Sequence, residues 1–226
     1  IDPTSFERWE ALLRASPRSV LLMLRWPSSP ERLRQQISAS GLRSSRLVFI
    51  SRLPQGEHLC AFRLADLALD SPSYSSGATG IDVLWSGVPM LAMVGGLRAG
   101  VRVGGKAAIP STAAASTSAS TIFQRNAVSL VAAAAQPYLQ AHSSAGYVEL
   151  GMGLIWRPAT RLAARRRARH ARQWAPLFDT KLWAKGFEAA VRAASEVRES
   201  SLPRPPAMHI IMRYRGGVGN PAQKNF

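Results

Sequence analysis

Over its first 95 residues the chain alternates short apolar runs with segments whose apolar residues recur at helical spacing. The apolar runs span residues 19–25, 46–50, 66–69 and 89–94. Because parallel strands are joined by crossovers that usually contain a helix, four such units predict an α/β fold with a doubly wound parallel sheet. The run at 19–25 is apolar throughout its middle, which favours a strand that is covered on both faces.

The helical segments carry residues that start and end helices. Asp2 precedes Pro3 and is expected as the N-cap of a helix that ends near Ser16. Gly41 and Gly87 follow helical segments and fit C-terminal caps, where glycine adopts a left-handed conformation. Further helices are expected from Pro30, at 57–64, 79–86, 123–135 and 145–156, after Pro158, and at 180–199.

Two segments of the chain lack a periodic pattern. Residues 95–122 are rich in Gly, Ala, Ser and Thr, and this composition predicts an inserted low-complexity loop without a strand or long helix. Residues 200–226 contain the strings LPRPP and RGGVGNP and are expected to form a basic disordered tail. The rest of the sequence, residues 1–199 with the inserted loop, is then one domain.

Composition excludes several classes of protein. Hydrophobic residues make up 46% of the 226 residues, which excludes a wholly disordered chain, and Trp9, Trp85 and Trp183 are expected to anchor the core. The single cysteine, Cys60, excludes an internal disulfide and favours a reducing, intracellular location. No apolar stretch approaches the roughly 18 residues of a membrane span, and no signal peptide is visible. A start at Ile1 instead of Met indicates a piece of a longer protein.

The chain is strongly basic, and its charge is unevenly distributed. Lys and Arg number 29 against 13 Asp and Glu, which gives a net charge of +16. Seven arginines lie within residues 157–172, where apolar residues separate them and no aromatic residues offer a surface for base stacking. This pattern favours a solvated helix face over specific nucleic-acid recognition. Nonspecific binding of polyanions is expected in addition. These arginines are Arg157, Arg161, Arg165, Arg166, Arg167, Arg169 and Arg172.

Two polar segments follow predicted strands, at the edge of the sheet where open α/β folds bind ligands. They span residues 53–58 and 74–82, and the second opens a helix. Free N–H groups at a helix start attract anions, so a diphosphate fits there, with Thr79 donating to a phosphate oxygen and Asp82 accepting from a ribose hydroxyl. An ordinary loop, with Thr79 as N-cap and Asp82 complementing the helix dipole, explains the same residues.

Specific strings extend over most of the chain up to residue 194. They are TGIDVLWSGVP within residues 63–93, PLFDTK within 175–183, YVELGMGL at 147–154, the pair Glu57-His58, and residues 1–27. In these strings the chain resembles the C-terminal lobe of the protein O-GlcNAc transferase (SPINDLY-related) glycosyltransferase family. The resemblance implies a Rossmann-like lobe of a GT-B glycosyltransferase, followed by C-terminal helices.

The resemblance also implies what the intact enzyme does. Such a lobe holds the donor UDP-GlcNAc, and GlcNAc is transferred to Ser or Thr of proteins in the cytoplasm or nucleus. The acceptor and the catalytic groups belong to an N-terminal lobe, so no catalytic residue is expected in this chain. No metal is expected either, since His142, His170 and His209 lack metal-ligand spacing. Related transferases share this lobe, so GlcNAc and fucose both stay open as the transferred sugar.

The resemblance assigns donor-binding roles to individual residues. His58 matches the histidine beside the uracil, and the backbone of Leu53 lies where the edge of the base is read. Thr79 matches the last threonine of the family's diphosphate-binding His-Thr-Thr string, and Asp82 matches the acid that binds the ribose. We therefore expect His58, Thr79 and Asp82 to converge on one cleft.

The chain departs from the family within this site. Gly77 and Ala78 stand in place of the histidine and the first threonine, and Gln55 replaces a lysine that contacts the ribose. A further lysine of the family, which meets the diphosphate, belongs upstream of Ile1. The lost donors favour a second hypothesis, a noncatalytic remnant of the fold that serves as a basic interaction module for acidic partners.

Overall fold

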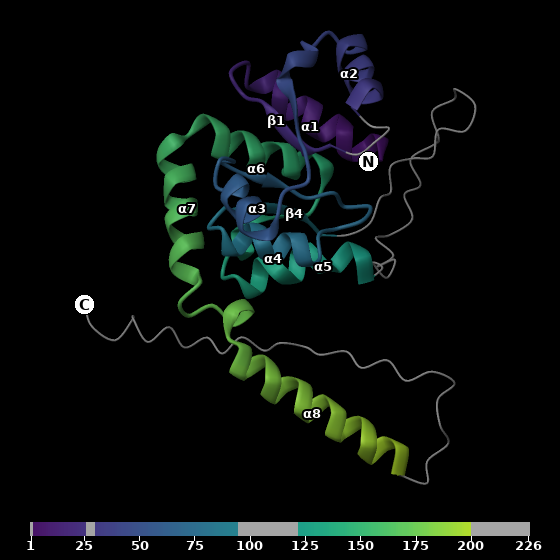
Figure 1. Cartoon of the computed structure of the whole chain (residues 1–226), viewed down its shortest axis with the longest axis vertical. Helices are drawn as coiled ribbons and strands as arrows, with labels where there is room; N and C mark the ends of the chain where they lie inside the picture. Colours follow the sequence, from purple (N-terminus) through teal and green to yellow (C-terminus); the bar gives the residue numbers. More distant parts are fainter. Residues whose placement is uncertain (1, 26–29, 95–121, 200–226) are drawn as a thin grey trace.

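The computed structural model describes residues 2–25, 30–94 and 122–199 of the chain (Figure 1). The loop expected at 95–122, apart from its last residue, and the tail expected at 200–226 lie outside these residues. Within the described ranges, no helix combines the length and the apolar character needed to cross a lipid bilayer. The described part is an α/β structure, as the sequence predicts.

Helices and strands follow the predicted alternating order along the first part of the chain. The helices are α1 (Pro3–Ala15), α2 (Pro30–Ala39), α3 (Gln55–Phe62), α4 (Ala78–Trp85), α5 (Ile122–Ala133), α6 (Ser144–Trp156), α7 (Pro158–Ala171) and α8 (Thr180–Glu199). The strands are β1 (Leu21–Leu24), β2 (Leu47–Ile50), β3 (Ala68–Leu69), β4 (Met90–Met93) and β5 (Gln140–Ala141). Short 3-10 helices are η1 (Ser44–Arg46), η2 (Pro137–Leu139) and η3 (Pro176–Phe178).

The predicted caps are present at the ends of several helices. Asp2 Oδ1 accepts a 2.9 Å hydrogen bond from the N–H of Ser5 and so caps α1, whose first residue is Pro3. Gly41 and Gly87 have φ angles of +81° and +76°, and they lie just beyond the ends of α2 and α4. Both glycines therefore adopt the left-handed conformation expected of a C-terminal cap.

The strands pair in parallel, but they form two sheets instead of one. β1 pairs with β2, and β3, β4 and β5 form a second sheet with β4 in the middle. β3 is only two residues long, so it offers few backbone groups to a further neighbour. The single predicted sheet is thus divided between β1 and β3 in the described part of the chain.

The strand predicted at 19–25 is not covered on both faces, which corrects the sequence analysis. The residues of β1 are only partly buried, and Leu24 is 40% exposed. The physical reason is a cavity that runs along β1 between the two sheets and leaves one side of the strand without neighbours. β5 has no counterpart in the sequence analysis, because Gln140 and Ala141 are too few to give a periodic signal.

Two apolar clusters form the core. The first joins α1 and α6 to both sheets and contains the fully buried ring of Tyr147. The second lies among α4, α5, α7 and β4, and every residue of β4 is buried. Figure 1 shows the same division, with α1, α2 and β1 at one end, α3, α4 and α5 around β4 at the other, and α6 between them.

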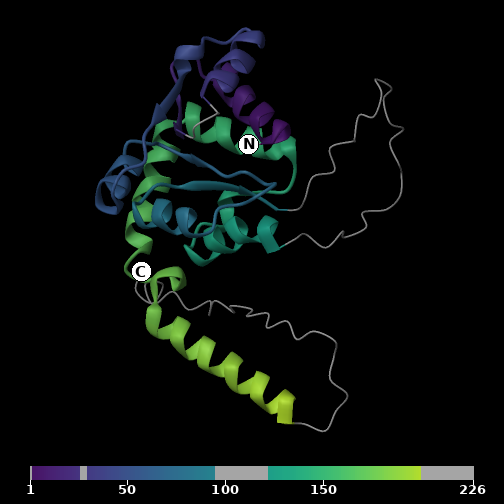
Figure 2. The same cartoon turned by 45° about the vertical axis from the view of Figure 1, so that its right-hand side comes forward.

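Of the three tryptophans predicted as core anchors, only Trp9 is buried, at 8% exposed. Trp85 is 43% exposed, and its ring meets Phe178 edge-on with centroids 5.4 Å apart. Trp183 is 60% exposed and stacks on Phe187, because α8 projects away from the rest of the described structure (Figures 1 and 2). Helical spacing therefore identified the helices correctly but not the surfaces against which they pack.

Candidate functional site

The two polar segments predicted to bind a ligand connect strands to helices. After β2, residues 51–54 lead to α3, which begins at Gln55. After β3, residues 70–77 lead to α4, which begins at Ala78. Both helices thus begin where a parallel strand ends, the place at which open α/β folds bind ligands.

A buried aspartate fixes the connection between β3 and α4. Asp70 is 3% exposed, and its carboxylate accepts 2.8 Å hydrogen bonds from the N–H and from the hydroxyl of Ser76. The carbonyl of Asp70 accepts a 3.0 Å hydrogen bond from the Tyr147 hydroxyl. Burial raises the pKa of Asp70 to about 6, although the hydrogen bonds from Ser76 act in the opposite direction. No local sequence pattern singles out Asp70, which holds the loop before α4.

The first turn of α4 packs too closely on its surroundings to admit a side chain at Gly80. A Cβ atom there would lie 2.9 Å from Leu130 Cδ1 on α5 and 2.9 Å from Ser76 Cβ in the preceding loop. The buried hydroxyl of Ser75 accepts a 3.2 Å hydrogen bond from the N–H of Ala127, also on α5. These contacts fix the position of the helix start.

The start of α4 presents backbone donors. Its N-cap, Gly77, has no side chain to accept from the helix, and the first turn contains no acidic residue. Since the first N–H groups of a helix have no partner within it, this end of α4 carries a positive partial charge. Gly77, Ala78 and Thr79 are all exposed at this end, so an anion can reach the donors.

A cavity of about 1250 Å³ lies between the two sheets and reaches this helix start. Thr79 and His58 both line it, so the structure places these two candidate residues on one cavity. The ring of His58 is partly buried and meets Phe62 edge-on, with centroids 4.4 Å apart. Its Nδ1 is buried and has no hydrogen-bond partner among the described residues.

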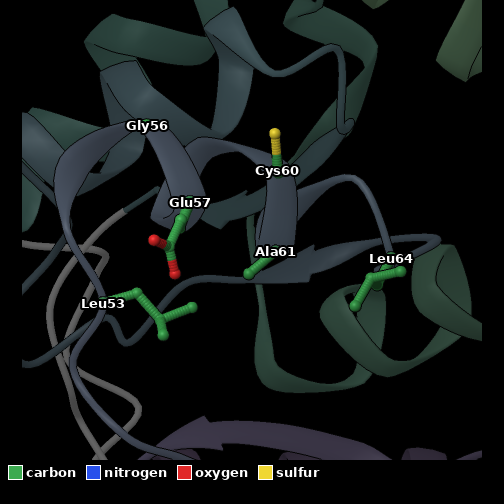
Figure 3. Close-up of a pocket in the computed structure, with 6 residues that line it drawn as sticks. All are labelled: Leu53, Gly56, Glu57, Cys60, Ala61 and Leu64. Carbon is green, nitrogen blue, oxygen red and sulfur yellow. The ribbon is translucent and has the colours of Figure 1, made fainter.

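The other candidate residues lie off the lining of this cavity. Asp82 is partly buried, one turn further along α4. Leu53 lines a separate pocket of about 450 Å³ together with Glu57 and Cys60 of α3. In Figure 3 the side chains of Leu53 and Glu57 lie on the same side of α3, whereas the sulfur of Cys60 points away from them. The structure therefore places His58 and Thr79 on one cavity, whereas the expected convergence of Asp82 on the same cleft is not observed and Leu53 lines a different pocket.

The arrangement suits an anionic ligand. The N–H groups at the start of α4, the Thr79 hydroxyl and the His58 ring can all donate hydrogen bonds to phosphate oxygens or to a polar ring. Across the part of the chain that the structure describes, no group of three or more His, Cys, Asp or Glu side chains could hold a metal ion. The donors at the start of α4 are the feature of this site that fits phosphate oxygens.

Comparison with known proteins identifies a family for almost the whole described chain. The family model described as Glycosyl transferase family 41 matches residues 1–187. These residues include both sheets, the cavity between them and every candidate binding residue. The match therefore covers the complete candidate site.

Individual relatives agree with this family. The chain is 38% identical over 94 residues to a UDP-N-acetylglucosamine–peptide N-acetylglucosaminyltransferase of Caenorhabditis elegans, which covers 41% of this chain and 8% of that protein. It is 30% identical over 191 residues to a probable enzyme of the same name from Arabidopsis thaliana, which covers 83% of this chain and 17% of that protein. The chain thus spans less than a fifth of the length of these relatives.

A solved structure shares the fold. A mutant of the O-GlcNAc transferase of Thermobaculum terrenum superposes with a TM-score of 0.68 at 21% sequence identity. The match covers 88% of this chain and 35% of that one. The described part therefore has the α/β fold of a Rossmann-like lobe within a GT-B glycosyltransferase, in agreement with the fold predicted from the sequence.

Proposed function

Because the chain belongs to glycosyl transferase family 41, we propose that it is the nucleotide-sugar-binding lobe of a protein O-GlcNAc transferase. Joined to an N-terminal lobe, it transfers GlcNAc from UDP-GlcNAc to Ser or Thr residues of proteins. The names of the two relatives support this donor and a peptide acceptor. The single exposed thiol, Cys60, fits a reducing compartment, the cytoplasm or nucleus.

The cavity shared by His58 and Thr79 is the observation that carries this proposal. The diphosphate of UDP lies at the start of α4, where backbone N–H groups and the Thr79 hydroxyl donate to its oxygens. His58 and the backbone of Leu53 lie beside the uracil, and Asp82 accepts a hydrogen bond from a ribose hydroxyl. The roles of Leu53 and Asp82 rest on the motif match alone, because neither residue lines the cavity.

The chemical task of this lobe is to hold the leaving group. When an acceptor hydroxyl attacks the anomeric carbon, the bond from that carbon to the β-phosphate oxygen breaks and negative charge builds on UDP. The positive start of α4 stabilises this charge, which supports a transfer that needs no metal ion. The acceptor site and the group that takes the hydroxyl proton belong to the N-terminal lobe.

Calorimetric titration of the chain with UDP tests the proposal. We expect UDP to bind, and Thr79→Ala to weaken binding roughly tenfold or more, since a hydrogen bond to a charged group contributes about 1.5–3 kcal/mol. Asp82→Ala weakens it similarly if the ribose lies where the motif places it. Thr160→Ala, at an exposed position of α7, is the matched control and leaves the affinity unchanged.

Titration with GDP in the same buffer shows whether the site prefers a donor that carries uracil or one that carries guanine. Binding of UDP but not GDP supports the GlcNAc donor. The proposal is contradicted if UDP does not bind, or if Thr79→Ala and Thr160→Ala bind it equally well.

A second candidate function is a basic interaction module for acidic partners. It is favoured by Gly77 and Ala78, which lack the family's donors, and by the exposed arginines Arg157 and Arg166 of the segment that forms α7. This function predicts binding to a polyanion such as heparin that weakens steeply with salt, together with no response to UDP. The UDP titration therefore decides between the two candidates.

A further inference from the structure

Helix α7 lies against the ends of α3 and α4 that face away from the candidate site (Figure 1). Its inner face carries small buried residues, which let the helix approach its neighbours closely. These residues are Ala164, Ala168 and Ala171. The arginines of α7 therefore lie within reach of the C-terminal carbonyl groups of α3 and α4.

Arg165 binds the C-terminal end of α3. Its Nη2 donates a 3.0 Å hydrogen bond to the carbonyl of Arg63, the C-cap of α3, and its Nη1 donates to the carbonyl of Ala65. Its side chain is 12% exposed and lies 3.6 Å from the carboxylate of Asp66. Arg161, one turn earlier, lies 3.5 Å from the same carboxylate. The Arg165 guanidinium thus donates to the carbonyls of Arg63 and Ala65 at the C-terminal end of α3, where positive charge is favourable.

Arg172, just beyond α7, binds the C-terminal end of α4 in the same way. Its Nη1 donates a 3.1 Å hydrogen bond to the carbonyl of Trp85, the last residue of α4. Its guanidinium carbon also lies 5.7 Å from the centre of the Trp85 ring, a cation–π contact. The end of α4 is therefore held by both a hydrogen bond and a ring contact.

The C-terminal end of α4 is also joined to α3. The Ser86 hydroxyl, at the C-cap of α4, donates a 3.1 Å hydrogen bond to the carbonyl of Leu59 in α3. Each of these helices has eight residues, which makes it about 12 Å long. A helix this short moves as a rigid rod, so a shift at its C-terminal end displaces residues at its other end.

We propose that Arg165 and Arg172 are positioning residues for the nucleotide site. By binding the C-terminal carbonyls of α3 and α4, they set where His58 and Thr79 stand on the shared cavity. Arg165 acts on His58 through α3, and Arg172 acts on Thr79 through α4. The inference rests on the proposed function, because it assigns the two arginines to UDP binding.

Arg166 provides a matched control on the same helix. It follows Arg165 directly and carries the same charge, but it is exposed and points away from the contacts that Arg165 makes. Replacing either arginine by methionine removes one charge and keeps a long side chain. A difference between the two variants therefore reports the contacts of Arg165 and not the net charge of the chain.

The test measures UDP affinity by calorimetry in Arg165→Met, Arg172→Met and Arg166→Met, each checked by thermal unfolding. We expect the first two to weaken binding roughly 2- to 30-fold in the folded protein, which is the range for changes that act through connecting elements, and Arg166→Met to match wild type. Arg165→Lys keeps the charge and one donor, so it restores part of the affinity and serves if Arg165→Met does not fold.

Double variants show through which residue each arginine acts. If Arg165 acts through His58, then Arg165→Met weakens UDP binding little further in a His58→Ala background, yet fully in a Thr79→Ala background. Arg172→Met shows the opposite pattern. If the arginines only stabilise the fold, their replacement lowers the unfolding temperature, but the loss of UDP affinity does not depend on whether His58 or Thr79 has been replaced. Fully additive losses, or equal losses in Arg165→Met and Arg166→Met, overturn the proposal.

NMR signals of the His58 ring, assigned with His58→Ala, give a readout that needs no nucleotide. We expect these signals to shift in Arg165→Met and to stay in place in Arg166→Met. If they shift in this way while no variant binds UDP, the positioning of His58 is upheld and the proposed function fails. If they do not shift in folded Arg165→Met, the positioning role of Arg165 is refuted whatever the affinity for UDP.

Discussion

At the residue scale, one buried carboxyl group makes the stability of the fold depend on pH. Burial raises the pKa of Asp70 to about 6, against 3.8 for an ordinary aspartate. Between these values the folded chain binds a proton that the unfolded chain releases, so the stability of the fold falls as the pH rises through this window. The shift corresponds to roughly 3 kcal/mol.

We expect Asp70→Asn to remove this contribution. Denaturant unfolding from about pH 4 to about pH 7 then shows the wild-type free energy of unfolding falling by roughly 3 kcal/mol relative to the variant. Glu149→Gln, at an exposed carboxyl group of α6, is the control and leaves the wild-type profile in place. Parallel profiles for wild type and Asp70→Asn refute the burial argument.

The candidate site also predicts how UDP affinity can be raised. Gly77→His, Ala78→Thr and Gln55→Lys restore the donors of the family pattern, and a Cβ atom at Gly77 meets nothing within 4 Å. Two charge-assisted hydrogen bonds of about 1.5–3 kcal/mol each strengthen binding by roughly two to four orders of magnitude in calorimetry. Ala132→Thr, on the exposed surface of α5, has no effect. Unchanged affinity in the triple variant means that the diphosphate does not lie at α4.

Single residues could be predicted from the sequence where their role depends on local order. Thr79 and His58 follow strand ends, which places them at one edge of the fold, and the family resemblance identified His58 within its segment. The role of Asp70 depends on Tyr147, which is 77 residues away in the sequence, and no local pattern reveals that contact. The placement of Leu53 in a pocket of its own likewise depends on how α3 packs.

At the scale of elements, the turn after α4 requires glycine for two independent reasons. Gly87 has a φ angle of +76°, and a Cβ atom there would overlap Arg169 Cγ on α7. Left-handed strain of about 1–2 kcal/mol and an overpacking penalty of about 1–3 kcal/mol add up. We expect Gly87→Ala to lower the free energy of unfolding by roughly 2–5 kcal/mol in denaturant titration.

Gly41 is the matched control for this prediction. Its φ angle is +81°, but a Cβ atom there meets nothing within 4 Å, so Gly41→Ala incurs the backbone strain alone. Adding Arg169→Ala to Gly87→Ala recovers the overpacking part of the loss. If Gly41→Ala and Gly87→Ala lower the free energy of unfolding equally, then α7 does not pack tightly against the turn at Gly87.

Elements with local signals were predicted well, and elements defined by distant partners were not. α1 and the helices after residue 122 have sequence signals within their own segments, so their ranges agree closely with the expected ones. β5 exists only because Gln140 and Ala141 pair with β4. The division into two sheets could not be predicted for the same reason. Whether β1 pairs with β3 depends on contacts between segments that are distant in the sequence.

At the scale of the whole molecule, α8 stands apart from the folded body. Trp9 and Trp183 allow a direct comparison, because both are helical tryptophans but one is 8% and the other 60% exposed. We expect Trp9→Ala to lower the free energy of unfolding by roughly 3–5 kcal/mol and Trp183→Ala to change it by at most about 0.5 kcal/mol. A large loss in Trp183→Ala means that α8 packs on the body in solution.

We propose that UDP binds at the cavity that His58 of α3 and Thr79 of α4 both line. The most direct test is an NMR titration of the isotope-labelled chain with UDP, followed at each backbone amide and histidine ring. We predict that the signals of the amides of Ala78, Thr79 and Gly80 and of the His58 ring shift together, with one affinity. Shifts confined to the exposed arginines of α7, or no shifts at the start of α4, contradict it.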